Sequence, residues 1–166
     1  MNIKIQHYLL VFSLLCIQTI SAQEDTTAID TLLNRWHRAA GQADFDTYFG
    51  LMSDDAIFVG TDAAEHWNKQ EFMSFSKPHF DKGSAWDFTA IERHIYFNQD
   101  HSIAWFDEVL DTWMELCRGS GVATKINGTW KITHYVLSVT APNEEIQQII
   151  PLKKASDTAY KAKLKQ

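Results

Sequence analysis

Residues 100–111, DHSIAWFDEVLD, read as a β-strand that carries two neighbouring carboxylates in its middle. The strand is expected over residues 102–110, where apolar and aromatic side chains such as Trp105 are frequent. Successive side chains of a strand point to opposite faces of the sheet, so Asp107 and Glu108 are expected on opposite sides. One carboxylate can then have a structural partner while the other borders a functional site.

Three more segments show the two-residue period of strands. Gln99-Asp100 and Asn127-Gly128 are the expected turns, and Asn-Gly is the dipeptide most typical of a two-residue hairpin. Because short turns join consecutive strands, the pattern predicts an antiparallel meander. The three further strands are expected over residues 86–98, 116–126 and 129–140.

Helical patterns fill the chain ahead of this meander. Residues 25–40 have apolar side chains at helical spacing, a shorter helix fits residues 44–52, and a short strand fits residues 56–59. Asn68 and Glu71, three residues apart, form the capping-box pattern that begins a third helix. Helices followed by an antiparallel meander predict one α+β domain.

The hairpin turns also predict which side chains face one another across the sheet. With the tip of the 111–115 turn near Trp113, Glu108 lies opposite Arg118, which predicts a structural ion pair. Asp107 then lies opposite Gly119 and has no cation facing it, and a glycine in a strand leaves room for a ligand. A single β-bulge in the sheet would exchange part of these faces.

The face with Asp107 is therefore the expected wall of a small-molecule pocket. Asp107 and His134 are the candidate catalytic pair, since a carboxylate and an imidazole can exchange protons near neutral pH. The alternative is that His134 is a hydrogen-bonded core residue and that the tryptophans fill the core. The predicted pocket-lining residues are Trp36, Phe58, Trp67, Glu92, His94 and Trp105.

Residues 1–22 have the pattern of a secretory signal peptide, in which Lys4 precedes an apolar run that ends in Ser-Ala. The mature chain is expected to begin at Gln23, to be periplasmic or secreted, and to have no stable membrane anchor. Cys16 would be lost with the signal peptide. Cys117 then remains as the single cysteine, so no internal disulfide is expected.

The composition limits the kinds of partner. Fifteen Lys and Arg against 21 Asp and Glu give a net charge of −6, which argues against nucleic-acid binding. The seven histidines lack metal-ligand spacing and no glycine-rich phosphate loop is present, so neither a metal nor a cofactor is expected. Residues 143–166 are lysine-rich and are expected to form a solvated tail.

Three stretches together resemble the SnoaL-like branch of the nuclear transport factor 2-like (NTF2-like) superfamily. They are FVGTDAAEHWNKQEF (58–72), IAWFDEVLD (103–111) and GTWKITHYVLS (128–138). The resemblance implies that residues 23–142 form a curved antiparallel sheet wrapped around three N-terminal helices, a cone with a pocket inside. Members include isomerases, cyclases, dehydratases and non-enzymatic binding domains, so the fold alone does not give the function.

Two functions follow from this resemblance. The first is an exported domain that binds a small apolar or aromatic molecule in the cone. The alternative is a small lyase or isomerase that uses Asp107 and His134. Family members often form homodimers through their sheets, and the second sheet face is too apolar to be left in water. The residues expected at the dimer surface are Ile91, Ile95, Phe97, Phe106, Leu137 and Val139.

Overall fold

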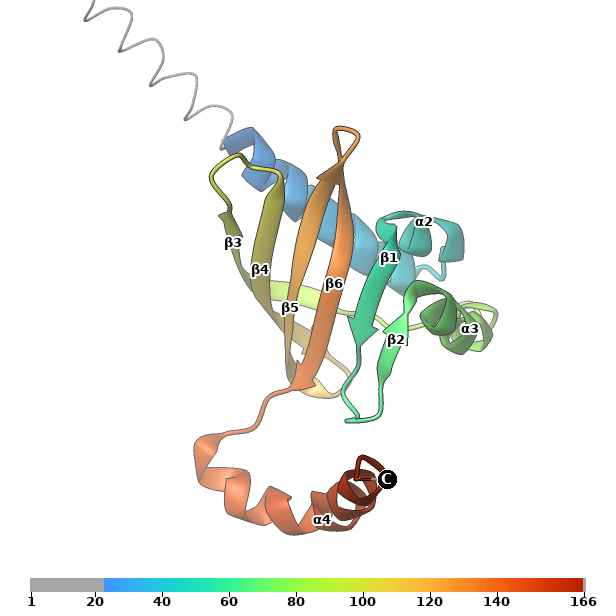
Figure 1. The fold of residues 1–166 in the computed structure, drawn as a ribbon, viewed down its shortest axis with the longest axis vertical. Helices are drawn as coiled ribbons and strands as arrows, with labels where there is room; N and C mark the ends of the chain where they lie inside the picture. Colours follow the sequence, from blue (N-terminus) through green and yellow to red (C-terminus); the bar gives the residue numbers. More distant parts are fainter. Residues whose placement is uncertain (1–22, 166) are drawn as a thin grey trace, which may run out of the picture.

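The structure is a computed structural model that describes residues 23–165 (Figure 1). The predicted signal peptide lies outside the described residues. In the part that is described, helices and a curved, unclosed sheet form the predicted α+β fold. Among these residues, no helix is both long and apolar enough to cross a membrane.

The sheet has six strands in the order β2-β1-β6-β5-β4-β3. The last four strands of the chain form the predicted antiparallel meander, while β1 runs parallel to β6 and antiparallel to β2. Strand β2 has only three residues and was not predicted, because so short a segment shows no periodicity. The strands are β1 (Met52–Val59), β2 (His66–Asn68), β3 (Thr89–Phe97), β4 (Ile103–Thr112), β5 (Glu115–Ile126) and β6 (Thr129–Val139).

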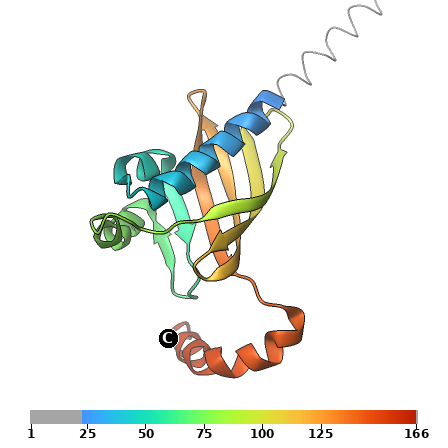
Figure 2. The same ribbon diagram turned by 180° about the vertical axis from the view of Figure 1, so that it is seen from behind.

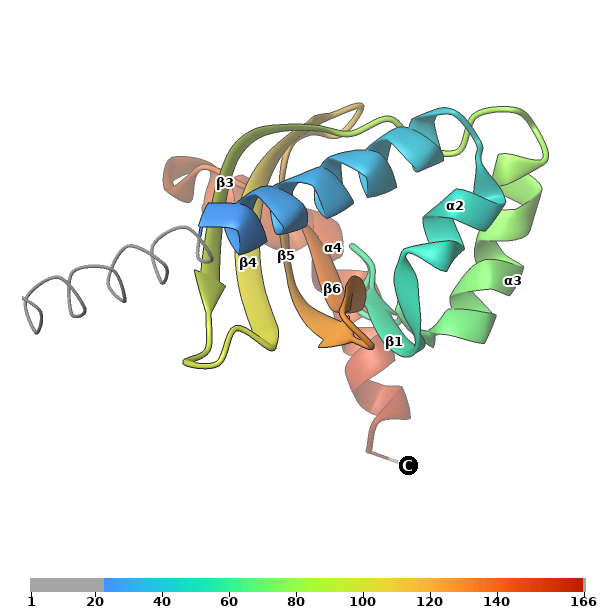
Figure 3. The same cartoon turned by 90° about the horizontal axis from the view of Figure 1, so that it is seen from above.

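The predicted helices are present as well. Residues 23–41 form an N-terminal helix that crosses the concave side of the sheet, and the sheet curves around it (Figures 2 and 3). Helix α2 (Phe45–Gly50) and helix α3 (Lys69–Phe80) follow. The predicted capping box begins α3: the backbone N–H of Glu71 donates to Asn68 Oδ1 at 3.0 Å, and that of Asn68 donates to Glu71 Oε2 at 2.9 Å.

The C-terminal segment is largely helical. A short 3-10 turn (Asn143–Glu145) leads into α4 (Ile146–Lys163), which lies apart from the sheet and runs across below it in the view of Figure 1. None of the side chains of α4 is buried. Residues up to Val139 therefore contain the whole packed core, as the buried aromatic and aliphatic side chains show.

The observed strand pairing differs from the predicted pairing at two places, and both affect which side chains face the core. Strands β4 and β5 pair with Thr112 opposite Glu115, so Glu108 lies opposite Gly119 and not opposite Arg118. The turn is one residue shorter than predicted, and Glu115 has a positive φ of 63°. The hydroxyl of Thr112 holds this turn by accepting from the N–H of Met114 and donating to the carbonyl of Glu115, both at 2.9 Å.

The second difference is a β-bulge between β5 and β6. Ala123 lies opposite Ile132, but Val122 lies opposite His134, so Thr133 is the extra residue in β6. Beyond this bulge, Tyr135 points into the cone and His134 points out.

Most of the face that was predicted as the dimer surface is the inner face of the cone, although two of its six residues, Ile91 and Val139, are more than half exposed. Phe106 and Leu137 are buried, while Ile95 and Phe97 are partly buried against the core. The prediction that this face is open is wrong, because the N-terminal helix covers it (Figure 2). The ion pair predicted between Glu108 and Arg118 is also wrong, since Glu108 points inward.

Candidate ligand cavity at the open end of the cone

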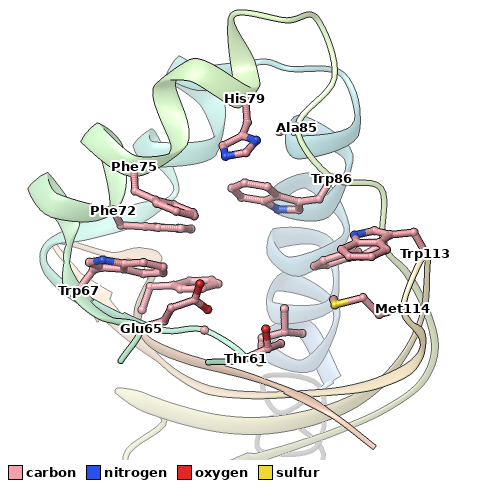
Figure 4. A pocket seen from close by; sticks show the side chains of 14 residues that line it. Thr61, Glu65, Trp67, Phe72, Phe75, His79, Ala85, Trp86, Trp113 and Met114 are labelled. Atoms are coloured by element: carbon pink, nitrogen blue, oxygen red, sulfur yellow. The ribbon is translucent and has the colours of Figure 1, made fainter. Parts of the chain in front are cut away.

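A cavity of about 370 Å³ opens at one end of the cone, and Figure 4 shows its lining. It lies where the β1–β2 turn, helix α3, the segment before β3 and the β4–β5 turn meet. Its wall is mostly aromatic, as is typical of small-molecule sites. The lining residues are Phe58, Gly60, Thr61, Glu65, Trp67, Phe72, Phe75, His79, Ala85, Trp86, Phe88, Trp113, Met114 and Leu137.

Helix α3 supplies one wall. Phe72, Phe75 and His79 follow at spacings of three and four residues, so they share one face of the helix. The ring of Phe72 stacks on that of Phe58 at 3.9 Å between centroids, and Trp67 stacks on Phe75 at 4.5 Å. These stacks join α3 to strands β1 and β2 and make this wall a continuous aromatic surface.

The opposite wall is more exposed. Trp86 is anchored against Phe80 with an edge-to-face contact of 5.5 Å between ring centroids. Trp113 occupies the tip of the β4–β5 turn, where 80% of its surface is exposed. Figure 4 shows the rings of Trp86 and Trp113 across the cavity from Trp67. An indole so exposed on a hairpin tip is available to cover a bound molecule.

Few polar side chains reach this cavity. Glu65 is its single carboxylate, and His79 and Thr61 supply the other ionisable or hydroxyl groups. Glu65 is held by its own loop: its Oε2 accepts from the N–H of Asp62 at 3.1 Å, and its carbonyl accepts from the N–H of Gly60 at 2.9 Å. In Figure 4 the Glu65 carboxylate points into the cavity.

A buried polar network lies deeper in the cone. Glu108 is fully buried, and its Oε1 accepts from Tyr135 Oη and pairs with His37 Nε2, each at 2.8 Å. Its Oε2 accepts from Arg93 Nε at 2.9 Å, while Arg93 Nη2 lies 2.7 Å away without hydrogen-bond alignment. Both oxygens of Glu108 therefore already have protein partners.

The network also shifts two ionisation equilibria. Burial raises the pKa of Glu108, but the hydrogen bond and charge of His37, with the charge of Arg93, outweigh burial and lower this pKa to about 2. The pKa of Tyr135 lies well above its ordinary value, first because of burial and then because of the Glu108 carboxylate. Glu108 is thus an ionised structural group beneath the cavity, not an acid poised to exchange protons.

The structure places the predicted site residues in three groups. Phe58 and Trp67 line the cavity. Trp36 is buried one layer beneath it, with its ring 6.4 Å from that of Phe58. The other five predicted residues point to the outer face of the sheet and do not line the cavity. They are Glu92, His94, Trp105, Asp107 and His134.

On that outer face Asp107 has other neighbours. Its Oδ1 lies 3.3 Å from His94 Nδ1 and 3.9 Å from Arg118 Nη1. His134 lies opposite Val122, on a different cross-strand row from Asp107. The placement predicted for the Asp107 and His134 pair inside the cone is therefore corrected, and the reasons are the shorter β4–β5 turn and the bulge at Thr133.

Twelve of the fourteen lining residues were not predicted, and these include Glu65, His79, Trp86 and Trp113. One sequence pattern could have identified His79, because it follows Phe72 and Phe75 on one face of a helix whose start was predicted. Glu65 and Trp113 lie in turns, where no periodicity indicates direction. Within residues 23–165, no group of three His, Cys, Asp or Glu side chains is arranged to hold a metal ion.

Solved structures support the fold. The chain is similar to a candidate dehydratase of the NTF2-like family from Streptomyces avermitilis, with a TM-score of 0.64, 11% identity, and coverage of 73% of this chain and 99% of that one. It is also similar to a candidate aromatic ring hydroxylase from Novosphingobium aromaticivorans (TM-score 0.62, 16% identity, 72% and 91% coverage). A third is an NTF2-like protein of unknown function from Pseudomonas putida (TM-score 0.59, 15% identity, 71% and 88% coverage).

At these identities the similarity concerns the fold alone. No curated protein sequence matches the chain. The SnoaL-like domain family matches residues 29–142, which is more than half of the chain and includes every strand of the sheet. The chain therefore belongs to the SnoaL-like domain family, and its fold is that of NTF2-like proteins.

Proposed function

We propose that this protein binds a small, largely aromatic or apolar molecule in the cavity at the open end of the cone. The observation that carries this proposal is the lining itself: about 370 Å³ of space bounded mainly by the rings of Phe58, Trp67, Phe72, Trp86 and Trp113. Aromatic side chains left around an open space can bury the flat face of a ligand.

A second hollow is less suited to this role. It has a volume of about 640 Å³ and lies between the N-terminal helix and the β5–β6 turn. Its lining is mainly polar or aliphatic, with Trp130 as its single aromatic side chain. A ligand there would meet Thr27, Thr31 and Arg35 in an open groove, and would not be enclosed by stacked rings.

Two tryptophans provide a matched test of the cavity. Trp113 lines the cavity and Trp105 lies on the outer face, yet both are largely exposed, at 80% and 47%. Trp113→Ala is expected to weaken binding of indole about tenfold, because it removes one ring contact of roughly 1 kcal/mol or more. Trp105→Ala is expected to leave the affinity unchanged. Isothermal titration calorimetry with indole on the wild type and both variants measures the difference.

Two further controls address the outer face directly. Asp107→Asn and His134→Ala are expected to bind indole as the wild type does, since neither side chain borders the cavity. Weaker binding in these variants, together with unchanged binding in Trp113→Ala, would move the site to the outer face of the sheet.

We also propose that the protein forms a homodimer through this outer face. Tyr96 and Trp105 lie opposite each other and stack at 6.0 Å, and with Ile103 they leave an exposed apolar patch in which each side chain is more than 40% exposed. Such a patch on a sheet is typical of an interaction surface. Trp105→Glu is expected to give a monomer by light scattering, whereas Trp113→Ala stays dimeric. A wild type that is monomeric at high concentration would contradict the proposal.

A further inference from the structure

The charges of the side chains that line the cavity limit the chemical class of its ligand. Fourteen residues line it, and these include one carboxylate but no lysine and no arginine. Among the described residues, no Lys, Arg or His nitrogen lies within 4 Å of the Glu65 carboxylate, whereas Glu108, beneath the cavity, is fully paired. The cavity therefore presents a negative charge without a protein counterion.

The loop geometry directs this charge inward. The N–H of Asp62 donates to Glu65 Oε2 and fixes it, and within residues 23–165 no group donates a hydrogen bond to Oε1. Gly60 makes room for the side chain, because a Cβ at that position would lie 2.2 Å from Glu65 Oε2 and 3.0 Å from Glu65 Cβ. A half-buried carboxylate with a free oxygen is a hydrogen-bond acceptor for a ligand that carries N–H donors.

The aromatic rings of the cavity also favour a positively charged ligand. Trp67, Trp86 and Trp113 surround the space into which Glu65 points (Figure 4). The face of an indole ring carries negative potential and attracts cations more strongly than the rings of Phe or Tyr do. A carboxylate among tryptophans is the arrangement that recognises organic cations, since the rings desolvate the cation without neutralising the carboxylate.

We propose that the ligand of this cavity is an organic cation: a protonated amine joined to an aromatic or apolar body. The ammonium group donates to Glu65 and lies against the tryptophan rings, and the apolar body fills the space toward Phe58, Phe72 and Met114. This inference rests on the proposed function, because it names the chemical class that the same cavity takes. The opposing class is an organic anion, for which His79 on the α3 wall is the single possible partner in the lining.

Three indole compounds of similar size but different charge test whether the cavity prefers a cation. Tryptamine carries an ammonium group, tryptophol a hydroxyl group, and indole-3-acetate a carboxylate. Binding is measured by isothermal titration calorimetry at about pH 8, where the amine is protonated. Tryptamine is expected to bind at least tenfold more tightly than tryptophol, which corresponds to about 1.4 kcal/mol, and indole-3-acetate is expected to bind most weakly.

Two matched variants then test whether Glu65 causes the preference for tryptamine. Glu65→Gln keeps the shape of the side chain and is expected to reduce the preference for tryptamine over tryptophol to less than threefold. Glu92→Gln removes a carboxylate from the outer face and is expected to keep the full preference. Added salt should weaken tryptamine binding to the wild type more than tryptophol binding.

The outcomes separate this inference from the proposed function. If tryptophol or indole-3-acetate binds the wild type as tightly as tryptamine does, the cation inference is overturned while the cavity remains a binding site. If Glu65→Gln keeps the full preference, the inference is overturned as well. If none of the three probes binds the wild type, both the inference and the proposed function fail for aromatic ligands of this size.

Discussion

Glu108→Ala is expected to lower the free energy of unfolding by roughly 3–5 kcal/mol, the cost typical of removing one partner from a buried ion pair. The substitution removes one of two carboxylates from the Arg93 guanidinium, which is only 7% exposed, and leaves it Asp30 as a partner. It also leaves His37 Nε2 and Tyr135 Oη without their buried partner. Urea unfolding followed by circular dichroism measures the loss, and Glu108→Gln serves where the alanine variant does not accumulate.

The neighbouring carboxylate is the control. Asp107 is 35% exposed and makes two long contacts, 3.3 Å to His94 and 3.9 Å to Arg118, so Asp107→Asn is expected to cost less than about 1 kcal/mol. The pH dependence of the free energy of unfolding is a second readout of the role of Glu108. The folded-state pKa of Glu108, about 2, lies below its ordinary value of 4.5. Its stabilisation is therefore complete above about pH 4.5 and is lost as the pH falls through 2. Equal losses in the Asp107 and Glu108 variants would contradict this account.

Gly121→Ala is expected to destabilise the protein by about 3 kcal/mol, at the upper end of the usual cost of overpacking. A Cβ at Gly121 would lie 2.4 Å from the carbonyl oxygen of His134 and 2.7 Å from Cζ of Phe106. The first contact is with the backbone of the neighbouring strand, which cannot move without distorting the β5–β6 pairing. Thermal and urea unfolding of the variant measure this effect.

Gly50→Ala is the matched control for this substitution. Gly50 ends helix α2, and a Cβ there meets nothing within 4 Å. Alanine at this position is expected to change stability by less than about 1 kcal/mol and to favour the helix slightly. A Gly121→Ala variant as stable as Gly50→Ala would show that β5 and β6 are farther apart than in this structure.

The elements of the fold were predictable because they have regular sequence periods. The meander strands alternate, the Asn127-Gly128 turn has the two positive φ angles of 50° and 77° that this dipeptide favours, and the Asn68 capping box marks the start of α3. These features are local, so a single sequence contains them. Strand β2 could not be recognised because it is set by its pairing with β1.

The faces of the strands were not predictable in the same way. The two-residue turn between β4 and β5 has Trp113 and Met114 at its centre, and neither residue is typical of a tight turn. The bulge at Thr133 also has no mark in the sequence. Each feature shifts the register by one residue, and a shift of one residue moves a side chain to the other face. Asp107 was expected in the cone because the longer turn put Arg118 opposite Glu108, whereas Gly119 lies opposite Glu108 in the structure.

A crystal structure of the wild-type protein soaked with tryptamine tests most directly where the ligand binds. The account predicts an indole ring in the cavity between Trp67 and Trp113, with its ammonium group within hydrogen-bond distance of Glu65. Tryptamine bound instead on the outer face beside Tyr96 and Trp105, with the cavity unoccupied, would contradict the account.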